Sequence, residues 1–256
     1  IAMKRRMQAI AGGLCWVVLL LLWSHPVRAG QLSDRLSQFP DWQSKPAIGA
    51  ARGDLAYPDW MAGTWNVTST LVDTIAPLAP DIVTPGYEGN HRYLRRPVSF
   101  LVRFVPAQQR SRSWLETSMQ TVVVADRGFN GTQIAKAYLG ENNVVSVRVD
   151  EKDPNYQVTQ LKGEKQFVSI VTRRATEQPD SDRFIATEVY NQIFRSPARL
   201  YLNEVETTTE YERTAPETIA ARQVTAVYLS PKDPDYFKAN GRPVSLYRYQ
   251  LNMEKL

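Results

Sequence analysis

From Trp60 onward, apolar and polar residues alternate in short runs that predict β-strands. In residues 144–149 the valines at 145, 147 and 149 alternate with positions 144, 146 and 148. A period of two places one face of a strand on a core and the other in water. Comparable strand-like runs occupy residues 101–105, 166–173, 183–194, 204–213, 219–229 and 244–253.

The spacing of these runs predicts the fold class. Each run is bounded by Gly, Pro, Asn or Asp residues typical of turns, and helical patterns do not alternate with the strands. Short strands in that arrangement favour a meandering antiparallel sheet that closes on itself. We therefore expect a mainly all-β protein, an antiparallel β-barrel with one short helix in addition to an N-terminal signal helix.

One segment of the barrel region has the helical period instead. Apolar residues at 134, 135, 138 and 139 share one helix face, and Gly140 follows where helices commonly end. We expect a helix over residues 129–139 that caps one end of the barrel.

The N-terminus has the three parts of an export signal in order. Basic residues at 4–6 precede an apolar run from Ile10 to Trp23, and Val27 and Ala29 are small residues suited to cleavage after Ala29. A membrane-spanning helix needs about 20 apolar residues, and this run is shorter, so a retained anchor is the less favoured alternative. The sequence predicts an exported protein.

Three segments follow from this interpretation. Residues 1–29 form the signal peptide, residues 30–56 a polar leader, and residues 57–256 the barrel domain. A short helical turn is expected near the start of the leader. Order in the leader depends on docking, and Trp42 is the candidate side chain to dock it on the barrel.

Removing the signal changes the charge of the chain. The full sequence carries 31 basic and 26 acidic residues, but residues 1–29 hold four of the basic ones and no acidic one, which leaves a net charge of +1. Nucleic-acid binding usually needs a strong basic excess, so we expect no nucleic-acid partner. The remaining basic clusters, among them Arg173-Arg174, are interpreted as solvated loops or strand ends.

Common catalytic and metal motifs are excluded by composition. Cys15 lies in the signal, so the mature chain has no thiol for a disulfide, a nucleophile or a zinc site. Its single histidine, His91, excludes sites built from several histidines. The chain also lacks G-x-S-x-G, P-loop and G-x-G-x-x-G motifs. We predict no catalytic residue, no metal site and no resident cofactor.

The run 204–213 suggests a ligand site. Glutamates at 204, 206, 210 and 212 share one face, which we expect to be solvated, while the other face carries Val, Thr, Thr and Tyr. A dry core would favour Val, Ile and Leu, whereas a few polar groups in an apolar cavity suit a small ligand. The candidate ligand-binding residues are Thr207, Thr209, Tyr211, Tyr190 and His91.

The first strand opens with Gly63-Thr64-Trp65, a G-x-W triplet. At this point the chain resembles the lipocalins and the wider calycin group, which implies a lipocalin-like barrel. In that group the Trp plugs the closed barrel end and packs beneath an arginine from near the C-terminus. The resemblance therefore implies a structural barrel-end motif of Gly63, Trp65 and Arg248, with cation–π stacking between the last two.

Three blocks resemble a second group. Residues 57–66, 97–105 and 126–140 are similar to an uncharacterised family of exported proteins in cyanobacteria and chloroplasts. This resemblance implies a location in the periplasm or thylakoid lumen and a role near photosynthetic membranes.

Two functions remain open. The first is a binding protein that holds a small apolar or amphipathic ligand, such as a pigment, quinone or lipid, in the barrel. The alternative is a non-enzymatic assembly or maintenance factor that docks on a photosynthetic membrane complex through the loop 76–96, a segment rich in Pro and Gly. A weaker third possibility, by fold analogy, is an isomerase or de-epoxidase-type enzyme with Asp126, Glu188 and Glu206 as candidate acids.

Overall fold

A computed structural model of the chain describes residues 30–110 and 118–256. The predicted export signal, residues 1–29, lies outside the described residues. The chain divides into a unit Ile1–Gln31 and a unit Leu32–Leu256, and the second unit contains the whole sheet. Among the described helices, none combines the length and the apolar character needed to cross a membrane.

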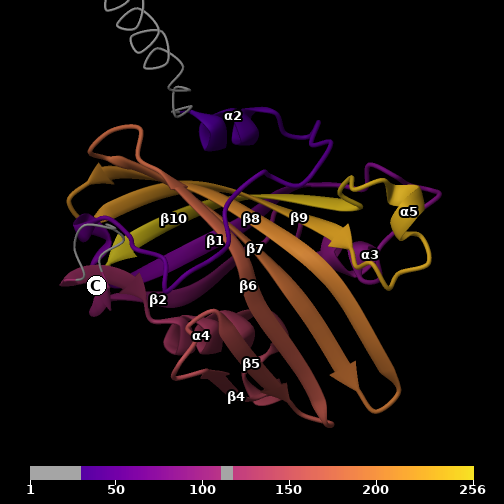
Figure 1. The fold of residues 1–256 in the computed structure, drawn as a ribbon. Helices are drawn as coiled ribbons and strands as arrows, with labels where there is room; N and C mark the ends of the chain where they lie inside the picture. The colour runs from indigo at the N-terminus through magenta and orange to yellow at the C-terminus, as the bar shows by residue number, and fades with distance from the viewer. Residues whose placement is uncertain (1–29, 111–117) are drawn as a thin grey trace, which may run out of the picture. The chain divides into compact units, whose positions relative to one another are not determined.

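Ten antiparallel strands form one continuous curled sheet in the order β3-β2-β1-β10-β9-β8-β7-β6-β5-β4 (Figure 1). The strands are β1 Gly63–Ile75, β2 Pro97–Arg110, β3 Met119–Ala125, β4 Val144–Val149, β5 Tyr156–Leu161, β6 Lys165–Glu177, β7 Arg183–Ser196, β8 Arg199–Ala215, β9 Thr218–Leu229 and β10 Ser245–Lys255. The short helices are α2 Gln31–Ser37, α3 Tyr87–Asn90, α4 Arg127–Leu139 and α5 Tyr236–Ala239, with 3-10 turns η1 Asp59–Met61, η2 His91–Tyr93 and η3 Glu141–Asn143.

The expected mainly antiparallel β fold is confirmed. Each predicted strand overlaps an observed strand in its residue range. Two strands, β3 and β5, were not predicted. The sheet also differs from the closed form expected, because its outermost strands β3 and β4 do not pair with each other within the described residues. The result is a half-barrel, an arrangement consistent with a lipocalin-like barrel.

The leader bridges part of the gap in this half-barrel. Ala50 pairs with Arg173 of β6, and the N–H of Tyr57 donates to the carbonyl oxygen of Val123 in β3 at 2.8 Å. Backbone groups at an open sheet edge need partners, and the leader supplies them on both sides of the gap. Residues 50–57 are therefore part of the barrel wall and not a separate appendage.

Helix α4 fills another part of the gap, alongside β2. Asp126 caps the helix by accepting from the N–H of Phe129 at 3.1 Å, and Gly140 ends it with a φ of +91°. The side-chain amide of Asn130 accepts from the N–H of Arg103 at 2.7 Å and donates to its carbonyl at 3.1 Å. A helical side chain thus takes the place of a neighbouring strand at the β2 edge.

The expected helix is confirmed with a start two residues earlier, but it lies along the gap between β2 and β4 and not across a barrel end. Its approach to β4 and β5 is close at Gly131, where an added Cβ would lie 2.9 Å from the Gln157 side chain and 3.1 Å from Val147. On its other side, the Tyr138 hydroxyl donates to Ser69 of β1 at 3.3 Å.

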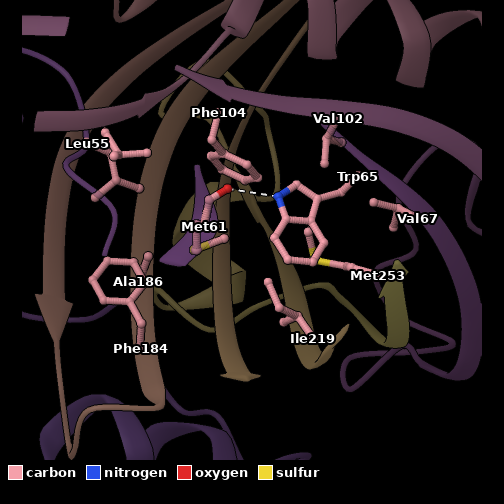
Figure 2. Packing of buried hydrophobic residues seen from close by; sticks show 11 residues of the cluster. Leu55, Met61, Trp65, Val67, Val102, Phe104, Phe184, Ala186, Ile219 and Met253 are labelled. Carbon is pink, nitrogen blue, oxygen red and sulfur yellow. Dashed lines mark hydrogen bonds between the residues drawn. The ribbon is translucent and has the colours of Figure 1, made fainter. Parts of the chain in front are cut away.

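A cluster of eleven buried hydrophobic residues lies at the end of the half-barrel where β1 begins (Figure 2). Trp65 is fully buried there, and its indole N–H donates to the carbonyl oxygen of Met61 at 2.8 Å. Phe104, Ile219 and Met253 pack in the same cluster. Trp65 therefore plugs this end, as the G-x-W resemblance implies.

The expected stacking of Arg248 on Trp65 is not formed. Strand pairing places Trp65 opposite Lys255, whose ammonium lies 5.5 Å from the indole centroid. Arg248 pairs instead with Asp73 near the far end of β1 and lies over the ring of Phe39, on the outer face of the sheet. The register of β1 and β10 keeps the two side chains apart.

The leader also covers the outer face of β8 and β9. Trp42 is 2% exposed and packs on Val224, Ala226 and Leu246, which confirms its expected docking role. The Arg35 guanidinium lies 3.9 Å from the Trp42 ring centroid. Figure 1 shows the α2 segment on the opposite side of the sheet from α4.

This cover corrects the expectation of a solvated acidic face on β8. Glu206 is completely buried and accepts two hydrogen bonds from Arg35, at 2.5 and 2.7 Å. Glu204 pairs with Lys45 of the leader and Arg173 of β6. An unpaired buried carboxylate is very costly, so these cations are what allows the leader to cover the acidic face.

Replacing Trp42 with Ala should lower the free energy of unfolding by about 3 to 5 kcal/mol, because a large buried aromatic side chain is lost. Urea denaturation of protein expressed from residue 30 measures the change. Phe237→Ala is the matched control, since Phe237 is 87% exposed and its loss should cost less than about 0.5 kcal/mol. Equal stability of the Trp42 variant and the wild type would show that the leader does not stabilise the barrel.

Candidate functional site

A cavity of about 590 Å³, here called the first cavity, lies between α4 and the inner face of β5, β6 and β7. Most of its wall is apolar, including Leu139, Leu161, Phe167, Val171 and Phe194. This volume falls within the range that small-molecule sites in proteins usually have. The half-barrel is therefore hollow on this side of α4.

A second cavity of about 310 Å³ lies on the other side of α4, against β1, β2, β9 and β10. Ala125, Asn130, Ile134 and Tyr138 line both cavities. Helix α4 thus divides the interior of the half-barrel into two neighbouring compartments.

Four charged side chains meet at the end of the first cavity where α4 begins. Arg127 contacts Asp54 at 2.8 Å and Glu188 at 2.9 Å, and Arg174 contacts the same Glu188 oxygen at 2.6 Å. Arg174 also donates to the side-chain oxygen of Asn155 at 2.7 Å. Two cations and two anions balance, so this charge network leaves no net charge to attract an ionic ligand.

The charge network keeps Glu188 ionised. Burial raises the pKa of Glu188, but the guanidinium groups of Arg127 and Arg174 outweigh burial and hold the pKa below its ordinary value. At neutral pH this carboxylate accepts hydrogen bonds and has no proton to give. It is a structural anion, poorly suited to act as a general acid.

Tyr190 supplies a neutral hydroxyl to the wall of the first cavity. Burial raises the pKa of Tyr190 to about 12, so the phenol keeps its proton at neutral pH. Its oxygen is hydrogen-bonded to the hydroxyl of Thr207, which in turn lies 3.3 Å from the hydroxyl of Thr225. These groups form a short polar row along the inner face of β7, β8 and β9.

The other predicted ligand residues on β8 also face inward. Tyr211 lines the second cavity, and burial raises its pKa to about 12. Thr209 is buried and donates to the side-chain oxygen of Gln223 at 3.1 Å. The structure therefore brings Tyr190 and Thr207 together, with Thr209 and Tyr211 farther along the same face. Ligand binding by these residues stays a prediction.

His91 lies apart from this group. It belongs to η2, packs edge-on against Tyr87 at 4.9 Å between ring centroids, and its Nδ1 lies 3.5 Å from a carboxylate oxygen of Glu88. It lines neither cavity. The geometry does not bring His91 to the other candidate residues.

The loop 76–96 that carries His91 is packed onto the barrel. Leu78 and Ile82 are buried against Leu229 and Val244, and the Thr84 hydroxyl is hydrogen-bonded to that of Ser245 at 2.6 Å. Leu78 and Ile82 thus point toward the loop's own domain, whereas Val83 is exposed. Docking of a partner on this loop stays a prediction.

The three acids named for an enzymatic role are all held by arginines. Asp126 contacts Arg103 at 2.6 Å and caps α4, Glu206 binds Arg35, and Glu188 belongs to the charge network described above. Each acid therefore has a structural partner that accounts for its position.

Sequence reasoning missed most of the charge network. The Arg173-Arg174 pair has the sequence pattern of a solvated strand end, yet Arg174 is 7% exposed, because the leader residues 49–54 cover it. Asp54 and Arg127 carried no signal of their own. One sequence signal bears on Asp54. The G-x-W triplet marks the start of the first strand at one barrel end, so residues shortly before it, including Asp54, are expected near that end.

Fold and cavities together define a hollow, curled antiparallel half-barrel with a polar end of balanced charge. The chain belongs to the family described as Domain of unknown function (DUF6816), whose model matches residues 49–256. The match begins in the leader, at the segment that bridges to β6. A comparison with curated proteins found no match.

Replacing Glu188 with Gln should destabilise the fold by about 3 to 5 kcal/mol at pH 7, since the buried Arg174 and the largely buried Arg127 lose their shared anion. The pKa of Glu188 is lower in the folded than in the unfolded chain, so its contribution is present above the ordinary value of 4.5 and is lost as pH falls through the folded pKa. The difference between the variant and the wild type should therefore shrink at pH 3.

Urea denaturation at pH 7 and pH 3 measures both differences. Glu151→Gln, in an exposed turn, is the control and should be neutral at both pH values. A Glu188 variant whose deficit stays constant across this range would contradict the assignment of an ionised, stabilising carboxylate.

Proposed function

We propose that the protein is a binding protein that holds a small apolar or amphipathic molecule in the first cavity, such as a pigment, a quinone or a lipid. The observation that carries the proposal is the cavity itself, about 590 Å³ with mostly apolar walls and a few inward polar groups. Such a combination is what small-ligand sites usually offer. A filled barrel interior would have had no such space.

The polar groups indicate an uncharged ligand with one or a few oxygen atoms. The charges of Arg127, Arg174, Asp54 and Glu188 are already satisfied by one another. A charged ligand would have to break these pairs or be buried without a partner, and both are costly. The neutral hydroxyl of Tyr190 is suited to a carbonyl or hydroxyl oxygen of the ligand.

Export to a periplasm or thylakoid lumen belongs to the same proposal, and it rests on the sequence of residues 1–29. A carrier in such a compartment would work beside a membrane that supplies apolar ligands. The alternative, an assembly or maintenance factor that binds a photosynthetic membrane complex through residues 76–96, has less support, because Leu78 and Ile82 in that loop are used on its own barrel.

Titration with N-phenyl-1-naphthylamine, a neutral apolar fluorophore, tests the cavity. We expect its emission to rise on binding to the wild type. Ser169 lines the first cavity, and Ser169→Trp places an indole in it. This substitution should weaken binding at least about tenfold, or about 1.4 kcal/mol.

Gln250→Trp is the matched control, because Gln250 is exposed on the outer face of β10, and its affinity should equal that of the wild type. The sulfonated relative of the probe, 1-anilinonaphthalene-8-sulfonate, should bind more weakly than the neutral one. Binding that is insensitive to Ser169→Trp would place the probe elsewhere and overturn the proposed site.

A further inference from the structure

Exposed apolar side chains gather around the open end of the first cavity. Leu139 is 45% exposed, Val145 61%, Phe194 41% and Leu200 58%. Large apolar side chains that collect on one exposed region commonly mark a surface that binds a membrane or another molecule. These four residues are called the apolar rim below.

Strand pairing places the members of the apolar rim at one end of the half-barrel. Helix α4 ends at Leu139, and β4 begins just after η3 with Val144 opposite Leu161. The β5–β6 turn and the β7–β8 turn lie at the same end, since Gln166 of β6 pairs with Arg195 of β7. The far end is the one plugged by Trp65, so the rim surrounds the open end only.

The two turns at this end are strongly basic. Lys162, Lys165, Arg195 and Arg199 are all exposed, and none of the four forms a salt bridge with any residue that the structure describes. Glu164 is the acid that lies among them. The turns therefore carry a net charge of +3, whereas residues 30–256 together carry only +1.

The apolar rim is continuous with the first cavity. Phe194 stacks on Phe167 at 4.6 Å between ring centroids and lies 6.1 Å from the ring of Tyr201. Phe167, Phe194 and Leu139 also line the cavity wall. Leu139 and Phe194 therefore belong both to the rim and to the cavity wall.

We propose that this end of the half-barrel docks on a lipid bilayer that contains anionic lipids. Phe194 and Leu200 would enter the boundary between headgroups and acyl chains, and the four basic side chains would lie against anionic headgroups. Apolar side chains flanked by Lys and Arg are what interfacial membrane binding requires, because burial of apolar area and electrostatic attraction add. Docking here would place the cavity opening on the membrane.

Sedimentation with vesicles tests docking without any added ligand, so docking and ligand binding can fail separately. One vesicle preparation contains phosphatidylcholine alone, and the other contains phosphatidylcholine with about 30% phosphatidylglycerol. We expect the wild type to bind the anionic vesicles at least about tenfold more tightly, and this preference to fall as NaCl is raised, because salt screens surface charge.

Two rim variants and one control identify the surface. Arg195→Glu combined with Arg199→Glu should remove the preference for anionic vesicles, and Leu200→Ser, on a side chain outside the cavity wall, should weaken binding to the anionic vesicles. The control combines Arg52→Glu with Lys152→Glu, the same charge change at two exposed residues away from the rim, and should bind like the wild type.

Several results would overturn the proposal. The wild type could fail to bind either vesicle type, or both rim variants could bind as well as the wild type. Binding to natural membranes that disappears after protease treatment, together with no binding to pure lipid vesicles, would show a protein partner instead.

Discussion

The fold depends on the partly buried charge network at the junction of four segments. Asp54 comes from the leader, Arg127 from the start of α4, Arg174 from β6 and Glu188 from β7. Because β3 and β4 do not pair within the described residues, the half-barrel must be completed by segments that are not sheet strands. The ion pairs of the charge network connect two of those segments, the leader and α4, to strands β6 and β7 of the sheet. Its four charges are expensive to bury singly and are acceptable only as a balanced set.

Closing the half-barrel in this way explains why one end is packed and the other hollow. At the packed end, strands and leader converge on Trp65. Toward the other end, a helix takes the place of a strand pair. Its backbone approaches β4 and β5 at Gly131, its Tyr138 side chain contacts β1, and cavities remain on both flanks. The balanced charges form the polar end of the larger cavity. Arg127 and Glu188 therefore belong both to the charge network and to the wall of the first cavity.

Local sequence patterns predicted many of the strands and helix α4. Features that depend on contacts between distant segments could not be predicted from the sequence. Alternation revealed most strands, and the helical period with Gly140 revealed α4, because both signals lie within a few consecutive residues. The row of glutamates on β8 has the pattern of a solvated face, yet Glu206 is buried by Arg35, 171 positions away. Whether Arg248 reaches Trp65 depends on strand register, including the irregularity between Leu71 and Asp73. The inward face of Thr207 and Tyr211 was predictable, but the charge network was not, since its partners come from four separate segments.

Native mass spectrometry of the protein, purified from its natural host in mild conditions, tests most directly whether the cavity beneath α4 holds a neutral apolar ligand. We expect an additional non-covalent mass of one small uncharged molecule, which is released on unfolding and reduced in Ser169→Trp. Protein that carries no such mass, or a mass that persists unchanged in that variant, would contradict it.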